Sequence, residues 1–157
     1  FGAFLLSEET YALGLSSRLS AIYANHPTTT LAFSLILADR KIVYCPDNEH
    51  PESQQAAIPG FEEKLRDFAR GADLLIHDAR LSPEDYSRAK GGGHSSWRGA
   101  LRLALDAAVR RLVLFHLDAG YSDDQLRELE SAAASEAAGR SLQLEVTAAR
   151  EGRILEL

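Results

Sequence analysis

The sequence predicts a single α/β domain, and three observations lead to this prediction. Strand-like and helix-like segments alternate from residue 41 onward, as they do when helices cover a sheet. Three short apolar segments are typical of buried strands, which need not alternate with polar residues: 41–45, 73–76 and 111–115. His or Asp lies at or just beyond the end of each. Ligands gather beyond the carboxyl ends of strands in such sheets, so these ends are where we look for chemistry.

The remaining elements follow from local patterns. The weak periodicity of residues 1–17 predicts only a loose strand and loop. The patterns of 18–24 and 31–38 predict strands, and Asp39-Arg40 is expected to form the turn before 41–45. Pro59 fits the first turn of a helix that ends at Gly71, and Ser82-Pro83 opens a short one. A third helix starts near Trp97, capped by Ser95 or Ser96, and a fourth starts from the Ser122 capping box and stops near Gly139. Two strands, 142–146 and 153–157, are expected to finish the chain.

Composition sets limits on the class of protein. The 157 residues suit one domain, 1–157, or one part of a larger one, and the chain begins at Phe1 without any Met, as a fragment or processed piece would. A net charge of −6 makes nucleic acid an unlikely partner without excluding a local basic patch. The single Cys45 favours a reducing compartment, and no apolar run is long enough for a membrane span, so we expect a cytoplasmic protein. Whether it forms a homo-oligomer stays open.

Five side chains could carry chemistry. His26, His94 and His116 stand where a loop meets a regular element, and Asp47 and Asp78 occupy matching strand ends. Imidazole nitrogen and carboxylate oxygen are ligands that zinc accepts, so the set is chemically sufficient for a metal site. No two of these residues form a local ligand motif, and a lone His at a strand end is more often a hydrogen-bonded structural residue.

Two other histidines are given structural or solvated roles. His77, beside Asp78 at a strand end, is expected to pack rather than to bind metal. His50 lies in an acidic loop and is expected to be solvated, with a minor role in substrate contact because Asp47 is near.

Taken together, five segments resemble the metallo-β-lactamase fold superfamily, and within it the phosphodiesterase branch that includes ribonuclease Z and the cyclic-phosphate phosphodiesterases. The resemblance covers roughly residues 18–125, with 21 residues from His26 to Asp47 and 22 from His94 to His116. The segments, in the family's order, are His26-Pro27-Thr28-Thr29-Thr30-Leu31-Ala32-Phe33, Val43-Tyr44-Cys45-Pro46-Asp47, Leu75-Ile76-His77-Asp78-Ala79, Gly93-His94-Ser95-Ser96 and Leu112-Val113-Leu114-Phe115-His116.

This resemblance implies roles for the five candidate residues. His26 would be the third histidine of a first metal, Asp47 the carboxylate that bridges two metals, and His116 the last ligand of the second. His94 would contact the substrate's phosphate or protonate its leaving group, oriented by Asp78, where relatives often have Glu. The cofactors implied are two divalent ions, with zinc leading and manganese or iron also acceptable to such ligands.

One family signature, H-x-H-x-D-H, is absent from the sequence. The chain therefore resembles the C-terminal half of an αββα sandwich, and whether it is an enzyme depends on that segment. The expected activity is hydrolysis of a phosphodiester by a hydroxide held between two metals, and the acidic balance favours a small-molecule ester or phosphodiester over a large RNA. The alternatives are a lactone or thioester hydrolase on the same metals, and a non-catalytic scaffold that has lost the N-terminal ligands.

Overall fold

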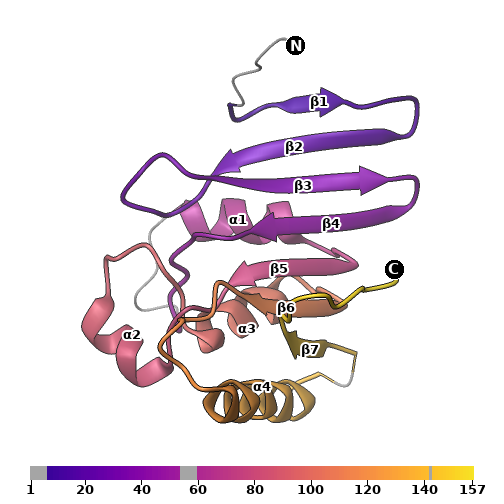
Figure 1. Ribbon diagram of the computed structural model, residues 1–157. Coiled ribbons are helices and arrows are strands. Elements are labelled where there is room, and N and C mark those ends of the chain that lie inside the picture. Colours follow the sequence, from indigo (N-terminus) through magenta and orange to yellow (C-terminus); the bar gives the residue numbers. More distant parts are fainter. Residues whose placement is uncertain (1–6, 54–59, 142) are drawn as a thin grey trace.

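A computed structural model describes residues 7–53, 60–141 and 143–157 (Figure 1). These residues form seven strands and four helices. Their bounds are β1 Thr10–Ala12, β2 Ser17–Tyr23, β3 Leu31–Leu37, β4 Arg40–Cys45, α1 Phe61–Ala69, β5 Leu74–Asp78, α2 Pro83–Ala89, α3 Trp97–Asp106, β6 Arg111–Phe115, α4 Asp123–Ala138 and β7 Glu145–Ala148. From β4 onward strands and helices follow one another as in an α/β domain, with α2 and α3 in succession.

The strands form one seven-stranded sheet in sequence order, β1 to β7. Strands β1 to β4 pair antiparallel as a meander, and β4 to β7 pair parallel through helical crossovers. Because parallel strands end at the same edge of a sheet, the residues that follow β4, β5 and β6 emerge side by side. The topology alone therefore brings Asp47, Asp78 and His116 toward one edge.

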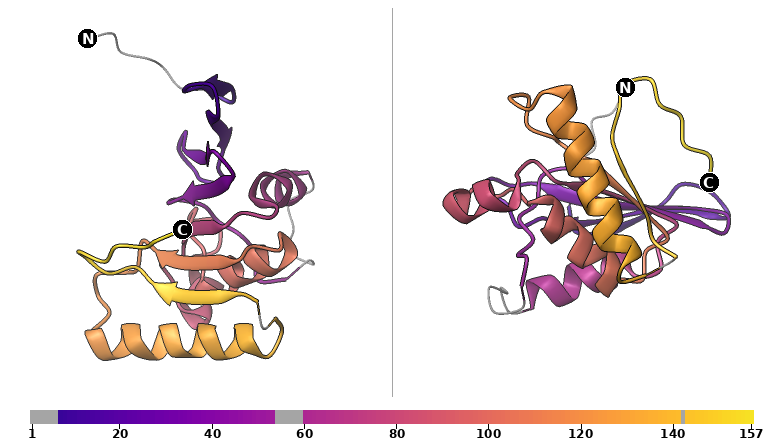
Figure 2. Two further views of the ribbon diagram at one scale, coloured as in Figure 1. Left: turned by 90° about the vertical axis from the view of Figure 1, so that its right-hand side faces the viewer. Right: turned by 90° about the horizontal axis from the view of Figure 1, so that it is seen from below.

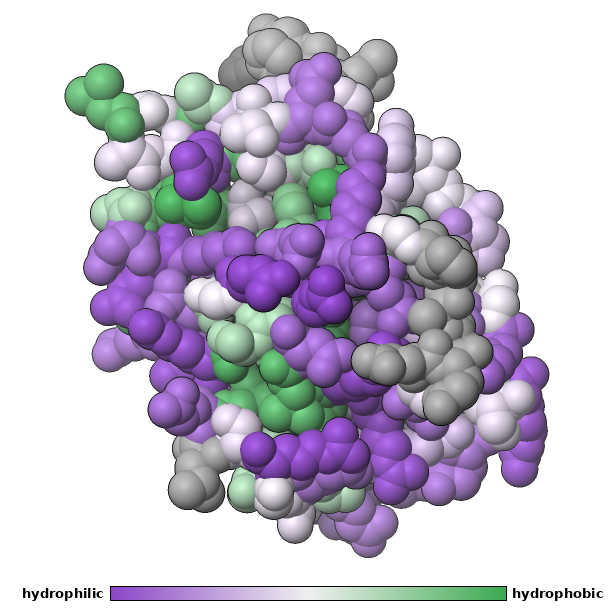
Figure 3. Space-filling model, turned by 180° about the vertical axis from the view of Figure 1, so that it is seen from behind, coloured by the Kyte–Doolittle hydropathy of each residue, from purple (hydrophilic) through white to green (hydrophobic). Residues whose placement is uncertain are grey.

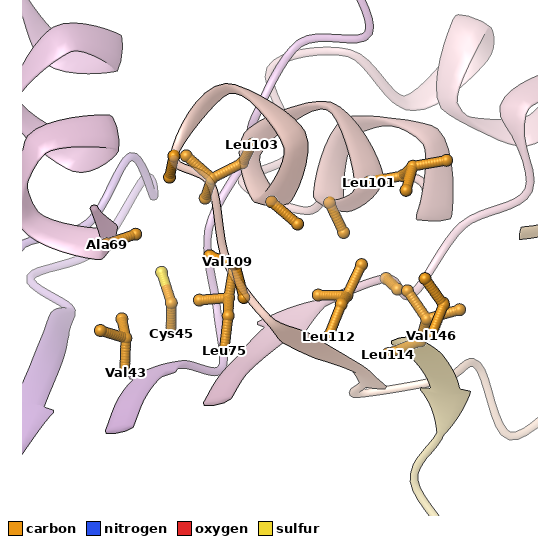
Figure 4. Packing of buried hydrophobic residues seen from close by; sticks show 14 of the residues in the cluster. Val43, Cys45, Ala69, Leu75, Leu101, Leu103, Val109, Leu112, Leu114 and Val146 are labelled. Carbon is orange, nitrogen blue, oxygen red and sulfur yellow. The ribbon is translucent and has the colours of Figure 1, made fainter. Parts of the chain in front are cut away.

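Three helices cover one face of the sheet. Figures 1 and 2 show α1 and α3 behind the strands and α4 along the β7 edge. The apolar side of α3 packs on β5 and β6, where Leu103, Leu75 and Leu112 are fully buried (Figure 4). Burying a leucine contributes about 1.5–3 kcal/mol, so this contact anchors the parallel half of the sheet. The outer surface of the helix side is mostly hydrophilic (Figure 3).

The opposite face of the sheet carries apolar side chains that stay partly exposed. Val43 and Cys45 point to the helices, so the alternation of β4 places Ile42 and Tyr44 on the other face. Phe33 pairs with Tyr44 there, and Tyr44 is 37% exposed. A sheet face of this kind is typical of one that packs against another layer.

The helix starts agree with the sequence patterns. Ser96 caps α3 by accepting a hydrogen bond from the Gly99 N–H, and Ser122 and Gln125 form the capping box that opens α4. Helix α1 begins at Phe61 after Gly60, and Pro59 lies outside the described residues.

Three local predictions are wrong. The turn before β4 is Ala38-Asp39, because Leu37 pairs with Arg40 and Ala38 takes the left-handed turn conformation. The last strand is 145–148 rather than 142–146, since pairing with β6 sets its position, and residue 142 lies outside the described residues. Residues 153–157 form no strand: the segment is tied to β6 by a hydrogen bond from the Arg111 side chain to the Glu156 carbonyl, and Ile154 is 87% exposed.

Candidate metal centre

Four side chains converge at the carboxyl edge of the parallel strands. Asp47 follows β4, Asp78 ends β5, His94 precedes α3 and His116 follows β6. One ligand atom from each lies within 4.8 Å of the others. His26 does not belong to this group of four, which we call the metal-centre group.

The backbone at His116 is held in an unusual conformation. Its φ is +58°, in the left-handed region that residues other than glycine seldom adopt. This turns the ring so that Nδ1 lies 3.1 Å from an Asp47 carboxylate oxygen and 3.6 Å from an Asp78 oxygen. Despite these distances Nδ1 is buried without a hydrogen-bond partner in the described part of the chain. Buried polar atoms are nearly always partnered, so a nitrogen aimed at two carboxylates and left unbonded fits a cation ligand.

Asp78 holds His94 in place. Its buried carboxylate accepts hydrogen bonds from the backbone N–H groups of Asn48, Arg80 and Ser95, at 3.2, 3.0 and 3.3 Å. His94 Nδ1 lies 2.7 Å from the same carboxylate, which assigns the Nδ1 proton to this bond. His94 is thereby oriented with Nε2 as its remaining functional nitrogen.

His26 lies next to the metal-centre group, with its ring against that of His94. The His26 and His94 ring centroids are 5.4 Å apart, and those of His94 and His116 are 4.9 Å apart. His26 Nδ1 is occupied by the hydroxyl groups of Thr28 and Thr30, at 2.9 and 3.1 Å, which leaves Nε2 as the nitrogen that could bind a metal. The structure thus places His26 beside the group without including it.

Gly93 allows the His94 loop to approach His26. Its φ is +87°, and a Cβ atom there would lie 2.4 Å from the His26 ring and from Pro27. Such contacts are far inside van der Waals distance, so glycine is required at this position. No local sequence pattern connects Gly93 to His26, because the two residues lie on separate loops.

Sequence reasoning missed Glu49, which joins the Asp47 loop to the His94 loop. Its nearly buried carboxylate accepts hydrogen bonds from the backbone N–H groups of Gly91 and Gly93, and from the Tyr86 hydroxyl at 3.2 Å. Burial and the Glu49 charge raise the pKa of Tyr86, which keeps that hydroxyl a donor. In the sequence Glu49 belongs to an acidic segment with the composition of an exposed loop, so no local signal marks it.

The expectation that His50 is solvated is wrong. His50 is 2% exposed, and neither ring nitrogen has a hydrogen-bond partner among the described residues. Burial, with smaller effects of His77 and Arg102, holds its pKa well below the ordinary value, so it packs as a neutral ring. His77 is fully buried as well and bonds to the Asp78 carbonyl and the Asn48 side chain, which accords with a packing role.

The donor set fits a divalent metal. Two carboxylates and two imidazoles meet at one edge, and the unbonded His116 Nδ1 is the atom that a cation would satisfy. Asp78 differs from the other three because its oxygens already accept several hydrogen bonds. Asp47 and His116 are therefore the members best placed to bind metal directly.

Comparison with known proteins defines the class. The family model of the Beta-lactamase superfamily domain matches residues 7–117, and the chain belongs to this family. The α/β fold agrees with it, and the family together with the site implies divalent metal ions.

The sequence relatives narrow the branch. Ribonuclease Z of Gemmatimonas aurantiaca is 45% identical over 89 residues, which are 57% of this chain and 26% of that protein. Ribonuclease Z of Haloferax volcanii is 47% identical over 66 residues, 42% of this chain and 21% of that protein. The chain therefore spans about a quarter of the length of these relatives. The predicted likeness to the ribonuclease Z branch is confirmed.

Solved structures support the same fold. The metallo-β-lactamase fold protein YhfI from Bacillus subtilis matches with a TM-score of 0.69 and 23% identity, over 95% of this chain and 53% of that one. The short form of human tRNase Z matches with a TM-score of 0.65 and 24% identity, over 95% of this chain and 46% of that one. Nearly the whole chain therefore corresponds to about half of each neighbour.

One expectation about partners is overturned. The net charge led us to expect a small-molecule substrate and to consider nucleic acid unlikely, yet the relatives named ribonuclease Z and the human tRNase Z act on RNA. Net charge sums over the whole surface, whereas a bound substrate contacts only the groups around its site, so net charge is a weak guide to the substrate. As for membranes, no helix among the described residues is long and apolar enough to cross one.

Proposed function

We propose that this chain carries one side of a metal-dependent phosphodiesterase centre whose substrate is RNA. The observation that carries the proposal is the convergence of the metal-centre group, within 4.8 Å, around a His116 nitrogen that no described residue hydrogen-bonds. The identities of 45% and 47% to two ribonucleases Z support the substrate class.

The proposed cofactors are two zinc ions, held through His26, Asp47 and His116. These three side chains would hold the ions, because imidazole and carboxylate ligands suit zinc while also accepting manganese or iron. When bound, such ions would activate water and neutralise the charge that develops on phosphorus. The position of His26 beside the His94 ring supports this assignment.

The chain's own groups would orient the substrate and move a proton. His94 is fixed through Nδ1 by Asp78, and its Nε2 accepts a hydrogen bond from Arg80 in this structure. To donate to the leaving oxygen, or to a phosphate oxygen of the bound substrate, Nε2 would take up a proton and release the hydrogen bond from Arg80. Asp78 positions His94, and being fully buried, it does not contact substrate.

We also propose that residues 1–157 form the C-terminal part of an αββα domain. The partly exposed apolar face of β3 and β4 would pack against a second sheet, as the match to about half of two structural neighbours supports. The segment with the H-x-H-x-D-H pattern would then complete the ligand set. A cytoplasmic location is consistent with the buried, unpaired Cys45.

The test uses the complete protein that contains this chain. Bound zinc is counted by elemental analysis, and hydrolysis of an RNA oligonucleotide is compared with hydrolysis of a lactone. We expect metal and RNA cleavage in the wild type, and loss of both in His116→Ala. A metal-free complete protein would instead indicate a scaffold, and turnover of the lactone alone would indicate the other hydrolase class.

A further inference from the structure

We propose that Arg80 binds the phosphate group of the substrate at the metal centre, an inference that rests on the proposed phosphodiesterase function. Arg80 is the second residue after Asp78, at the exit of β5. It belongs to none of the candidate site residues that the sequence alone suggests.

The geometry directs the guanidinium of Arg80 to His94. Arg80 Nη1 lies 3.3 Å from His94 Nε2, and Arg80 Nε donates a hydrogen bond of 3.1 Å to Asp118. Asp118 is the second residue after His116, so the pair connects the loops that leave β5 and β6. Nη2 makes no hydrogen bond among the described residues and stays available to a ligand.

The charges around the centre give Arg80 a specific task. Asp47, Asp78 and Asp118 are carboxylates, and in the described part of the chain Arg80 has the one cationic group that hydrogen-bonds a member of the metal-centre group. A planar guanidinium with free N–H groups is the side chain best suited to a phosphate, because its fork matches two oxygens at once.

A purely structural role explains the arrangement less well. The side chains of Arg80 and Asp118 are 40% and 34% exposed, and exposed ion pairs contribute little to stability. The pair instead restrains the guanidinium beside His94 before substrate arrives, which lowers the entropy cost of binding.

The experiment compares Arg80→Met and Arg80→Lys in the complete, zinc-loaded protein, with bis(p-nitrophenyl) phosphate as substrate. Loss of a charge-assisted hydrogen bond to phosphate predicts that Arg80→Met raises KM about tenfold or more, with a smaller change in kcat. Arg80→Lys retains the positive charge but not the planar fork of N–H groups, so its KM should lie between those of the wild type and Arg80→Met. Zinc content should stay at the wild-type value in both variants.

The matched control is Arg127→Met, which removes an exposed arginine of α4 that pairs with Asp124 and, among the described residues, hydrogen-bonds no member of the metal-centre group. Its KM should equal that of the wild type. An unchanged KM in Arg80→Met, or equal losses of kcat, zinc content and thermal stability, would overturn the inference and leave the proposed function standing. A zinc-loaded wild type that fails to hydrolyse the phosphodiester would overturn both.

Discussion

Replacing Gly99 with alanine tests how closely α3 packs against the loop that carries Asp47. A Cβ atom at position 99 would lie 2.3 Å from the His50 carbonyl oxygen and 3.3 Å from its carbon. The oxygen would have to retreat by about 1 Å to reach ordinary contact, where attraction replaces repulsion. Neither side can yield easily, because the His50 N–H bonds to Ser95 and the Pro51 carbonyl accepts a bond from Arg102.

The magnitude follows from two opposing terms. Glycine to alanine inside a helix normally stabilises by about 1 kcal/mol, whereas overpacking against a fixed backbone costs about 3 kcal/mol at the upper end of its usual range. We therefore expect Gly99→Ala to lower the free energy of unfolding by about 2 kcal/mol. Urea denaturation measures this change through the midpoint at constant slope. Metal affinity should fall too, because Asp47 lies on the displaced loop.

The control for this prediction is Gly139→Ala at the end of α4. Gly139 has φ of −70°. The nearest atoms to an added Cβ are 3.6 and 3.8 Å away, which is ordinary contact. This variant should be as stable as the wild type or slightly more stable. Equal stability of Gly99→Ala and the wild type would refute the reasoning, as would an equal loss in both variants.

Three further predictions concern the core, the metal and pH. Leu103 is fully buried, and Leu103→Ala should lower the free energy of unfolding in urea by about 2–5 kcal/mol. Leu15 is fully exposed, and Leu15→Ala should change this free energy by less than about 0.5 kcal/mol. Similar losses in both variants would contradict the assignment of Leu103 to the core. His116→Ala should weaken zinc binding by at least about tenfold in calorimetry, and unchanged affinity would remove His116 from the ligand set. The pKa of His50 is lower in the folded than in the unfolded state, so below about pH 6.5 the unfolded state binds more protons than the folded state. The free energy of unfolding should therefore decrease as the pH falls below about 6.5, by at most about 1.4 kcal/mol per pH unit. His50→Gln should flatten this dependence, and an identical slope in wild type and variant would contradict it.

The sequence predicted the positions of β4, β5 and β6 because their signals are local. A run of large apolar residues ended by a polar one describes a buried strand and its exit, and parallel pairing then places the three exits at one edge. The amino-acid sequence alone was therefore enough to expect Asp47, Asp78 and His116 near one another. What local patterns do not contain is pairing register, which is why the final strand was misplaced by three residues at its start.

Burial of polar residues in loops was the larger omission. Glu49 and His50 stand in a segment whose composition is that of a solvated loop, yet both are nearly inaccessible. Their burial results from contacts with residues more than forty positions away: the Gly91 and Gly93 N–H groups for Glu49, and Ser95 for His50. A single sequence carries no record of such contacts, so composition alone gives the opposite answer.

The alternation of side chains along β6 does not predict the direction of the His116 side chain. Leu112 and Leu114 face the helices, so an extended chain would send the side chain of residue 116 toward the helices as well. The left-handed φ of His116 breaks this alternation and turns the ring to the Asp47 carboxylate. That conformation costs about 1–2 kcal/mol for a residue with a Cβ, and it persists only where surrounding structure imposes it. Nδ1 forms no hydrogen bond with the described residues, so the strained conformation is not offset by such a bond. A bound cation is the partner whose interaction with Nδ1 would offset the cost of this conformation.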